Sequence, residues 1–439
     1  MKRLGTIIVI GLLLLGSFLV FNLYFNINET YGAGEEFVIY INSDDIGNIA
    51  VKVSLPDEAR YSNGAPILVV TNTFFTPKSE FDSDTWAQDQ GFIRVSYLWP
   101  GTEDVKSGVL SEGENDYGGN ISMQAYRDVI LFALGEIPDY EGNYITDLSE
   151  IVPLTDNVGL YAFSHPGIAA TNVLAFYSNE LNGVKYFVGR ENPTIDKLSS
   201  VEVGHYQNPD SRVKVKLFNP FYDYIEDYSS FDLDIDYSNI KYNLDLGRPF
   251  FDINEDGLYD EDDFLLGDRT PEMFGKKYYS VDLIQALVDN EVFSNWPSDL
   301  ATLDEVQKDW PLRETTKNYD LLTGSSLKVM LIFAKDDHVQ VAEDKPHIHQ
   351  AFDGFFKSAN LWVRLNPDKS YVSSLSNFDI GSYSDNNANI ELDDWRKINE
   401  LAYQDFPGSA SIVSAAGVAE MADRVQYNYW ADDLDRVLE

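Results

Sequence analysis

Short runs of apolar residues recur along most of the chain and alternate with segments of helical spacing. Such runs are typical of strands buried on both faces, as in a parallel sheet with helices on either side. The first two runs, 37–41 and 49–53, flank a turn-rich stretch and predict an antiparallel hairpin. Six later runs predict further strands, at 66–70, 92–97, 158–162, 184–188, 328–333 and 361–365.

Segments with the apolar spacing of a helix lie between and after these runs, at 123–137, 168–177, 343–357, 392–404 and 417–437. Alternation of strands and helices predicts an α/β fold in which helices flank a mostly parallel central sheet. The alternation breaks between 201 and 325, where Asp, Tyr and Asn are frequent. We expect this segment to form a cap inserted into the fold.

The amino-terminal segment predicts where the protein resides. Lys2 and Arg3 precede an uncharged, apolar run from Leu4 to Phe21. This length favours an uncleaved signal anchor with its start inside the cell and its body outside. The alternative is a signal peptide cleaved near 31–34. In both cases the body lies outside the cytoplasm, attached to the cell membrane or secreted.

These patterns divide the chain into four expected parts. The first is the signal anchor or signal peptide, the second and fourth form the core, and the third is the cap. The signal segment spans 1–30, the first half of the core 31–200 and the cap 201–325. The second half of the core, with the carboxy-terminal helices, spans 326–439.

The amino-acid composition limits the ligands and the catalytic mechanisms that are open to the protein. The chain of 439 residues has 72 acidic against 32 basic residues, a formal net charge of −40. A surface this negative repels phosphate backbones, which argues against nucleic-acid binding, and it attracts divalent cations. The sequence contains no cysteine, which excludes disulfides, thiol catalysis and cysteine-ligated zinc.

One serine stands in the context of a catalytic nucleophile. The segment 161–167 reads Tyr-Ala-Phe-Ser-His-Pro-Gly and joins an expected buried strand to an expected helix. A nucleophile elbow requires such a strand–turn–helix context, with small residues near the serine. Ala162 is small, Pro166 suits the first turn of a helix, and Gly167 permits close packing on the sheet. Ser164 is therefore the candidate nucleophile.

The order of these features resembles the α/β-hydrolase superfamily, in particular its serine hydrolases and peptidases with an inserted cap. The resemblance covers most of 37–370 and implies an acid after the strand at 328–333. Asp337 matches that position best, and Asp336 is the alternative. The resemblance also implies an oxyanion hole made by the backbone N–H of His165 and one from the loop near 72–74.

The sequence departs from the family at the general base. The family's histidine is expected just after Leu365, but the chain there reads Asn-Pro-Asp-Lys, and none of its five histidines lies beyond position 349. Without an imidazole, the serine lacks the usual acceptor of its proton. The other candidates are His165 beside the serine, His338 beside the acid, His347 and His349 on the following helix, and Asp368.

These candidates differ in their expected placement. Side chains of neighbours on a tight turn generally point apart, which argues against His165, and His338 is the best placed of the group. We expect His347 and His349 to be surface residues. An exposed carboxylate such as Asp368 is too weak a base to match a serine hydroxyl.

A second motif lies inside the expected cap. The segment 252–263 follows the D-x-N-x-D-G pattern with an acidic residue at the closing position, which is typical of an EF-hand calcium loop. Asp at the closing position is similar to extracellular, dockerin-like loops. Gly257 makes the turn, and the expected ligands are Asp252, Asn254, Asp256, the carbonyl of Leu258, Asp260 and Asp263.

Two functions are consistent with the sequence. The first is a calcium-stabilised, extracytoplasmic serine esterase or peptidase that acts on a small-molecule ester or a peptide. The second is a calcium-binding cell-surface protein, either a binding module or a scaffold, that keeps the hydrolase fold without its chemistry.

Overall fold

The structure is a computed structural model of the chain. It describes residues 30–72, 78–81, 85–195, 199–207, 216–223, 234–268, 272–335, 337, 345–375, 402–403 and 410–430. The apolar run of the expected anchor lies outside this part of the chain, and so does the expected helix at 392–404 except for Ala402 and Tyr403. Tyr403 forms a β-bridge with Ala334, so these two residues are not helical. Within it, no helix combines the length and apolar character needed to cross a membrane.

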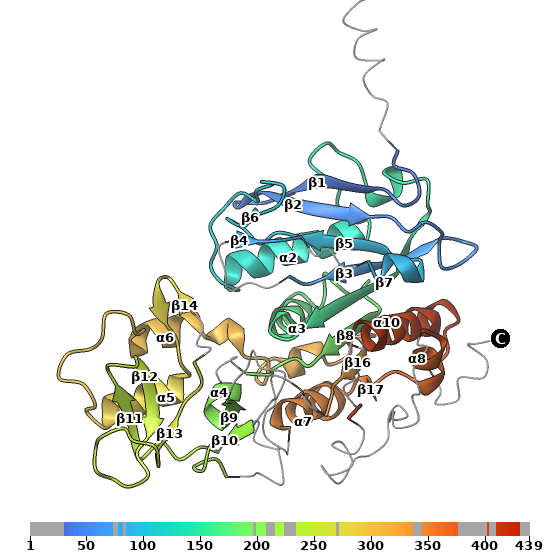
Figure 1. The fold of residues 1–439 in the computed structure, drawn as a ribbon. Helices are drawn as coiled ribbons and strands as arrows, with labels where there is room; N and C mark the ends of the chain where they lie inside the picture. Colours follow the sequence, from blue (N-terminus) through green and yellow to red (C-terminus); the bar gives the residue numbers. More distant parts are fainter. Residues whose placement is uncertain are drawn as a thin grey trace, which may run out of the picture.

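A sheet of eight strands forms the centre of the molecule (Figure 1). Each of the eight apolar runs overlaps one of these strands. Both faces of the sheet are covered, so its strands are apolar on both sides. In spatial order they are β1 (Glu36–Ser43), β2 (Gly47–Ser54), β5 (Ile93–Tyr97), β3 (Ala65–Val70), β7 (Pro153–Phe163), β8 (Tyr186–Arg190), β16 (Lys328–Ile332) and β17 (Trp362–Leu365).

The sheet is parallel except for β2, which pairs antiparallel with both β1 and β5. The pairs from β5 through β3, β7, β8 and β16 to β17 are all parallel. This strand order and the single reversed strand are those of the α/β-hydrolase fold. The expected fold class is therefore confirmed.

Alternate residues of each strand face opposite layers of helices. In β3, Ile67 and Val69 belong to one core cluster, and Leu68 and Val70 belong to the other. The first cluster includes residues of α2 (Asn120–Ala133), α3 (Pro166–Phe176), α7 (Pro346–Asp353) and the π-helical turn η6 (Gly354–Ser358). The second includes residues of α8 (Lys369–Leu375) and α10 (Ala410–Gln426).

Short elements fill the connections of the core. The two-residue strands β4 and β6 pair with each other, and the others are single turns of 3-10 helix. Their bounds are β4 (Lys78–Ser79), η1 (Gln88–Gln90), β6 (Glu103–Asp104), η2 (Ile145–Asp147), η4 (Pro311–Arg313) and η5 (Tyr319–Leu322).

The chain between β8 and β16 forms small sheets and helices beside the central sheet, at the lower left of Figure 1. Its buried apolar residues from Val201 to Trp310 form a hydrophobic cluster of their own, whereas Tyr319, Leu322 and Leu327 belong to a core cluster of the central sheet. The cap boundaries at 201 and 325 stay predictions. Its elements are α4 (Ser199–Val203), β9 (Gly204–Tyr206), β10 (Lys216–Phe218), β11 (Ile240–Asn243), β12 (Arg248–Phe251), β13 (Phe264–Leu265), β14 (Glu272–Met273), β15 (Lys276–Lys277), α5 (Val281–Asp289) and α6 (Leu303–Asp309).

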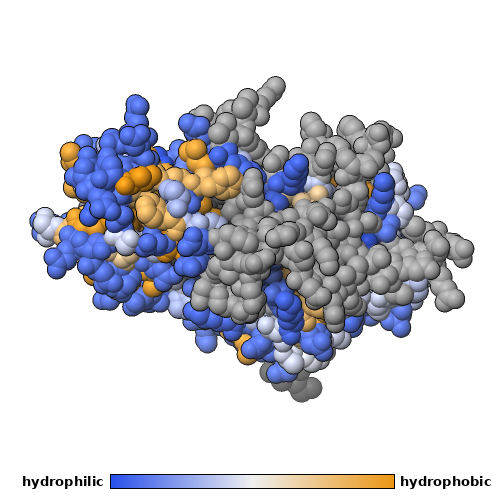
Figure 2. Space-filling model, turned by 90° about the horizontal axis from the view of Figure 1, so that it is seen from below, coloured by the Kyte–Doolittle hydropathy of each residue, from blue (hydrophilic) through white to orange (hydrophobic). Residues whose placement is uncertain are grey.

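The face seen in Figure 2 carries residues of both high and low hydropathy. Seen from below, hydrophilic residues cover most of the coloured face, and a small group of hydrophobic residues lies on the side of the cap (Figure 2). Single exposed apolar residues are normal on soluble proteins. The described part of this face is therefore mainly hydrophilic.

Candidate active site

Ser164 occupies a sharp turn between β7 and α3. β7 ends at Phe163 and α3 begins at Pro166. The backbone of Ser164 has φ 61°, in the left-handed region that residues with a side chain rarely adopt. Strained residues of this kind cluster at active sites, where the surrounding structure holds them in place. The turn presents Ser164 at the carboxyl end of the sheet.

The side chain of Asn192 stabilises this turn through hydrogen bonds. Its amide nitrogen donates to the carbonyl oxygens of Ala162 at 3.1 Å, Ser164 at 2.7 Å and Arg190 at 3.1 Å. In addition, the backbone N–H of Ser164 donates to the carbonyl of Arg190 at 2.8 Å. These bonds tie the end of β7 to the end of β8 and stabilise the strained serine.

Two glycines make room for Asn192. A Cβ atom on Gly167 would lie 2.1 Å from Asn192 Cγ, and one on Gly189 would lie 2.2 Å from Asn192 Oδ1. Both distances are far below van der Waals contact, so any larger residue at either position displaces the amide. The sequence predicted close packing at Gly167, but it gave no signal for Asn192 as the residue packed against it.

The imidazole of His165 lies next to the serine hydroxyl. The distance between Ser164 Oγ and His165 Nδ1 is 3.4 Å, and only 9% of His165 is exposed. The expectation that these neighbouring side chains point apart is therefore wrong. Successive side chains alternate in a strand, but the left-handed backbone of Ser164 interrupts that alternation.

Asp337 lies at the same edge of the sheet as Ser164. Phe163 of β7 pairs with Arg190 of β8, and Arg190 pairs with Ile332 of β16, so β7 and β16 end level with each other. Two strand spacings, about 10 Å in all, separate them. Asp337 follows β16 and is fully buried, and its backbone carbonyl accepts a hydrogen bond from Tyr206. The neighbouring candidates Asp336 and His338 lie outside the described residues.

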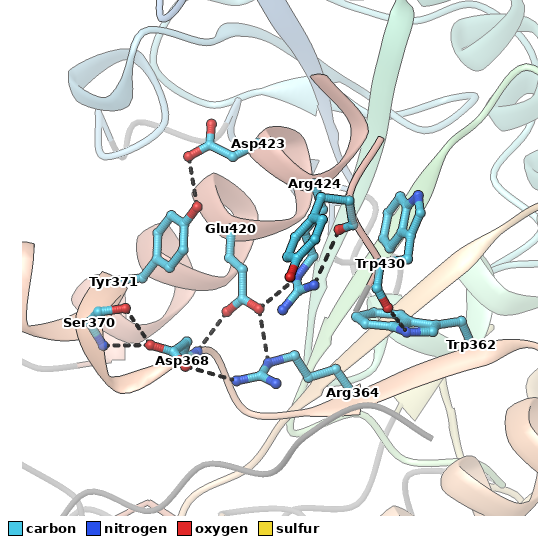
Figure 3. Close-up of polar contacts among 10 residues, drawn as sticks. Trp362, Arg364, Asp368, Ser370, Tyr371, Glu420, Asp423, Arg424 and Trp430 are labelled. Atoms are coloured by element: carbon cyan, nitrogen blue, oxygen red, sulfur yellow. Dashed lines mark hydrogen bonds and ion pairs between the residues drawn. The ribbon is translucent and has the colours of Figure 1, made fainter. Parts of the chain in front are cut away.

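The loop after β17, where the family carries its histidine, has a structural role here. Asn366 is fully buried, and its side-chain oxygen accepts a hydrogen bond from the backbone N–H of Phe333 at 3.0 Å. The carboxylate of Asp368 accepts hydrogen bonds from Ser370 at the start of α8 and lies 3.6 Å from the guanidinium of Arg364 (Figure 3). Asp368 is thus held by a helix cap and an ion pair.

Behind this loop, Glu420 of α10 lies between two arginines (Figure 3). Arg364 Nε and Arg424 Nε are each 2.9 Å from Glu420 Oε1, and all three side chains are fully buried. Glu420 Oε2 accepts the backbone N–H of Asp368 at 2.6 Å. The charges compensate one another, so this network anchors the loop on α10.

His347 and His349 of α7 are buried, with 1% and 4% exposed, so the expectation of surface residues is wrong. Burial lowers the pKa of each to about 3, because the cationic form loses its hydration. The backbone N–H of Thr194 donates to His347 Nδ1 at 3.2 Å. The face of α7 that carries His347 packs inward, a placement that its polar residues did not predict.

The expected oxyanion loop begins beside the end of β7. The backbone N–H of Thr71 donates to the carbonyl of Tyr161 at 3.0 Å, and the Thr71 hydroxyl is hydrogen-bonded to the phenol of Tyr126. The indole of Trp99 donates to the carbonyl of Asn72 at 3.1 Å. Residues 73–77 lie outside the described part, so the second oxyanion donor stays a prediction.

The predicted calcium loop connects β12 to β13, which pair with each other. An EF-hand joins two helices, whereas this loop closes a β-hairpin, a difference that the motif alone does not show. The backbone N–H of Gly257 donates to Asp252 Oδ2 at 2.8 Å, and Gly257 has φ 79°. The backbone turn at the sixth position of the loop is thus formed.

The oxygens of this loop fit calcium in part. Asp252 is 2% exposed, and its Oδ1 is buried without a hydrogen-bond partner. The carboxylate of Asp263 accepts backbone N–H groups of Ile253 and Asp260, at 2.9 and 3.0 Å. However, no group of three or more His, Cys, Asp or Glu side chains lies close enough to hold a metal anywhere in the described chain. A cation would have to draw these carboxylates inward.

No family model matches the chain, and no curated protein matches it. Among solved structures, it is similar to one of two fungal esterases from Rhizomucor miehei, with 10% sequence identity over 90% of this chain and 85% of that chain, at TM-score 0.43. A hyperthermophilic esterase from the archaeon Pyrobaculum calidifontis gives 9% identity over 91% of this chain and 85% of that one, at TM-score 0.40.

A peptidase gives a similar result over part of its length. For dipeptidyl peptidase 4 of Porphyromonas gingivalis, the identity is 10% and the TM-score 0.36, over 76% of this chain and 31% of that one. At such values we transfer no residue role and no substrate to this chain. The fold follows from the strand order, and the function must be argued from the side chains.

Proposed function

We propose that the protein is an extracytoplasmic serine hydrolase that cleaves an ester or peptide bond of a small substrate. The observation that carries the proposal is the backbone of Ser164, at φ 61° between a buried strand and the start of a helix. A strained turn persists only where other contacts enforce it, and Asn192 and two glycines are arranged to do so.

The proposed chemistry is acyl transfer through the serine. The Ser164 oxygen attacks the carbonyl carbon of the substrate, and the carbonyl oxygen gains the negative charge. The backbone N–H of His165, with a second donor from the loop after Asn72, stabilises this oxyanion. Asp337, at the same sheet edge, is the proposed acid that orients the base.

We also propose that calcium stabilises the cap and that the body lies outside the cytoplasm. The buried, unpartnered Oδ1 of Asp252 and the preformed turn at Gly257 support a cation at the 252–263 loop. The apolar segment from Leu4 to Phe21 supports an extracellular setting, where calcium is plentiful. Since the sequence has no cysteine to form a disulfide, a bound cation would be the device that stabilises the cap. The membrane is the proposed partner of that segment.

A specific observation favours a second function, that of a binding or scaffold protein without catalysis. The loop after β17 holds Asn366 and Asp368 in structural contacts at the place where the family has its base. A chain that lost its chemistry would conserve the fold and free this loop for packing.

Turnover of activated substrates separates the two. We expect the full-length protein to hydrolyse short p-nitrophenyl esters or peptide anilides above the rate of buffer, and Ser164→Ala to reduce the rate to background. Melting curves of both proteins serve as the control for folding. Equal, background-level rates of the wild type and Ser164→Ala across both substrate classes would favour the binding protein.

A further inference from the structure

The proposed hydrolase needs a group that accepts the proton of Ser164. Four of the five histidines belong to the described residues. His205 contacts the carbonyl of Leu265 through Nε2 at 2.9 Å, inside the cap. His347 and His349 are buried in α7, and burial opposes their protonation. Among these four, His165 contacts the serine hydroxyl, with 3.4 Å between Ser164 Oγ and His165 Nδ1.

We infer that His165 is the general base of this site and acts on Ser164 through its Nδ1 atom. The inference rests on the proposed function and assigns the role that the loop after β17 does not fill. The nucleophile and its base would then be adjacent residues at one turn. The backbone N–H of His165 would serve the oxyanion, while its ring serves the proton.

The local structure holds the ring in a fixed position. His165 has φ −54° and ψ −37° directly before Pro166, which begins α3, and its carbonyl accepts the N–H of Ile168 at 2.9 Å. Its backbone is therefore part of the first helical turn. Since the side chain is nine-tenths buried, packing restricts its rotamers. A ring held in this way needs little reorganisation to meet the hydroxyl.

The distance between Ser164 Oγ and His165 Nδ1 is typical of a catalytic site without bound substrate. Hydrogen bonds between a base and its nucleophile often exceed 3.2 Å before substrate binds and shorten in the complex. Nδ1 can accept a proton when the neutral ring carries its hydrogen on Nε2. In that tautomer, the hydroxyl of Ser164 donates to Nδ1.

The proton balance closes on these two residues. As Ser164 Oγ bonds to the carbonyl carbon, its proton passes to His165 Nδ1, and the carbonyl oxygen becomes the oxyanion. When the oxyanion reforms the carbonyl, the bond to the leaving group breaks, and Nδ1–H donates its proton to that group. Water then attacks the acyl carbon and gives a proton to Nδ1. When the bond from the acyl carbon to Ser164 Oγ breaks, Nδ1–H returns that proton to Oγ, and the acid is released with both residues restored.

The test replaces His165, which removes the imidazole ring. The backbone N–H of position 165, the proposed oxyanion donor, remains in every variant except proline. We expect His165→Ala to lower the rate of Ser164 labelling by a fluorophosphonate about 10²–10⁴-fold. Added imidazole should restore part of that rate, since it can enter the space left by the ring. His338→Ala tests the competing candidate, and the control His205→Ala, in the cap, should keep the wild-type rate. His165→Gln, which preserves most of the side-chain volume, should show the same loss if the alanine variant folds poorly.

The outcomes separate the inference from the proposed function. A wild-type rate in a folded His165→Ala or His165→Gln protein overturns the inference and leaves Ser164 as nucleophile. Loss of labelling in His338→Ala, with none in the position-165 variants, likewise assigns the base elsewhere. Failure of the wild-type protein to label at Ser164 overturns the proposed function, and the inference with it.

Discussion

At the scale of single residues, the candidate site depends on one strained backbone and the amide that restrains it. The left-handed backbone of Ser164 is stabilised by hydrogen bonds from Asn192, which follows the next strand, β8, in sequence. One –NH2 group bonds three carbonyl oxygens, of Ala162, Ser164 and Arg190. The strain is therefore supported from outside the turn itself.

Replacement of Asn192 by Ala should loosen the turn. Removal of this partly buried donor leaves up to three carbonyls with fewer hydrogen bonds, at a cost of about 1–3 kcal/mol in the free energy of unfolding. We also expect slower reaction of Ser164 with activated esters. Urea unfolding and initial rates measure the two effects. The matched control is Asn179→Ala at an exposed turn position. Equal stability of the two variants would contradict this role of Asn192.

Glu202, buried in the cap, should make stability depend on pH. Burial raises its pKa to about 7, while Tyr237 and Ser280 donate hydrogen bonds to its carboxylate. Asp282 lies near enough to raise the pKa further. A carboxyl with a raised pKa in the folded state favours folding while it is protonated. Its contribution is full below the unfolded value of 4.5 and is lost as the pH rises to about 7.

The expected loss is on the order of 3 kcal/mol across that window. Glu202→Gln stays neutral and keeps a similar shape, so its stability should lack this component. The measurement is urea unfolding of both proteins between about pH 5 and pH 8. The difference between wild type and Glu202→Gln isolates the one group from the other carboxylates. A difference that stays constant with pH would refute the assignment.

The sequence pointed to Ser164 because its context is local, a buried strand followed by small residues and a helix. It gave no signal for Asn192, Tyr126 or Glu202, because their roles come from residues distant in the chain. Glu202, for example, meets Ser280 across 78 positions. The proximity of His165 to the hydroxyl also required the observed backbone angle of Ser164.

At the scale of elements, α10 is fastened to the core by two buried ionic contacts. Arg60 donates to both oxygens of Asp423, at 2.6 and 2.7 Å, and Tyr371 donates to the same carboxylate (Figure 3 for Tyr371). One turn earlier, Glu420 bonds Arg364 and Arg424. Together these contacts position α10 on the face of the sheet.

Glu420→Ala should be strongly destabilising, because it leaves two buried guanidinium groups without their shared carboxylate. The expected cost is about 3–5 kcal/mol in the free energy of unfolding. Glu420→Gln keeps an acceptor and the volume of the side chain, so its cost should be smaller. Guanidinium chloride would screen these charges, so urea is the denaturant of choice. Equal costs for Ala and Gln would show that packing, and not charge, governs the site.

The eight strands of the central sheet were predictable because each is buried on both faces and therefore reads as an apolar run. The short strands of the cap were not, since pairs of two to four residues carry no periodic signal. The hairpin that carries the 252–263 loop also escaped prediction. The motif fixes the order of the oxygens but leaves the flanking elements open.

At the scale of the whole molecule, the excess of negative charge and the acidic loop make a bound cation favourable. We expect calcium to raise the melting temperature of the protein, and EDTA to reverse the rise. The double variant Asp252→Ala, Asp256→Ala should show no such rise. The control Glu261→Ala lies in the same loop at a position without a ligand role, and it should keep the response. A melting curve that calcium and EDTA leave unchanged would count against the site.

The arrangement of the site is also a property of the whole fold. Ser164 and Asp337 are far apart in sequence, and the sheet brings the ends of β7 and β16 level with β8 between them. Strand alternation predicted the sheet but not its strand order, which the structure gives. The base could not be predicted, because the family's position for it holds Asn366 and Asp368.

Covalent trapping tests the central claim most directly, namely that the Ser164 oxygen is an activated nucleophile at the rim of the sheet. The full-length protein is incubated with a fluorophosphonate, digested, and mapped by mass spectrometry. We predict a single phosphonylated residue, Ser164, and no adduct in Ser164→Ala. A folded wild-type protein that stays unmodified, or carries its adduct on another residue, would contradict the account.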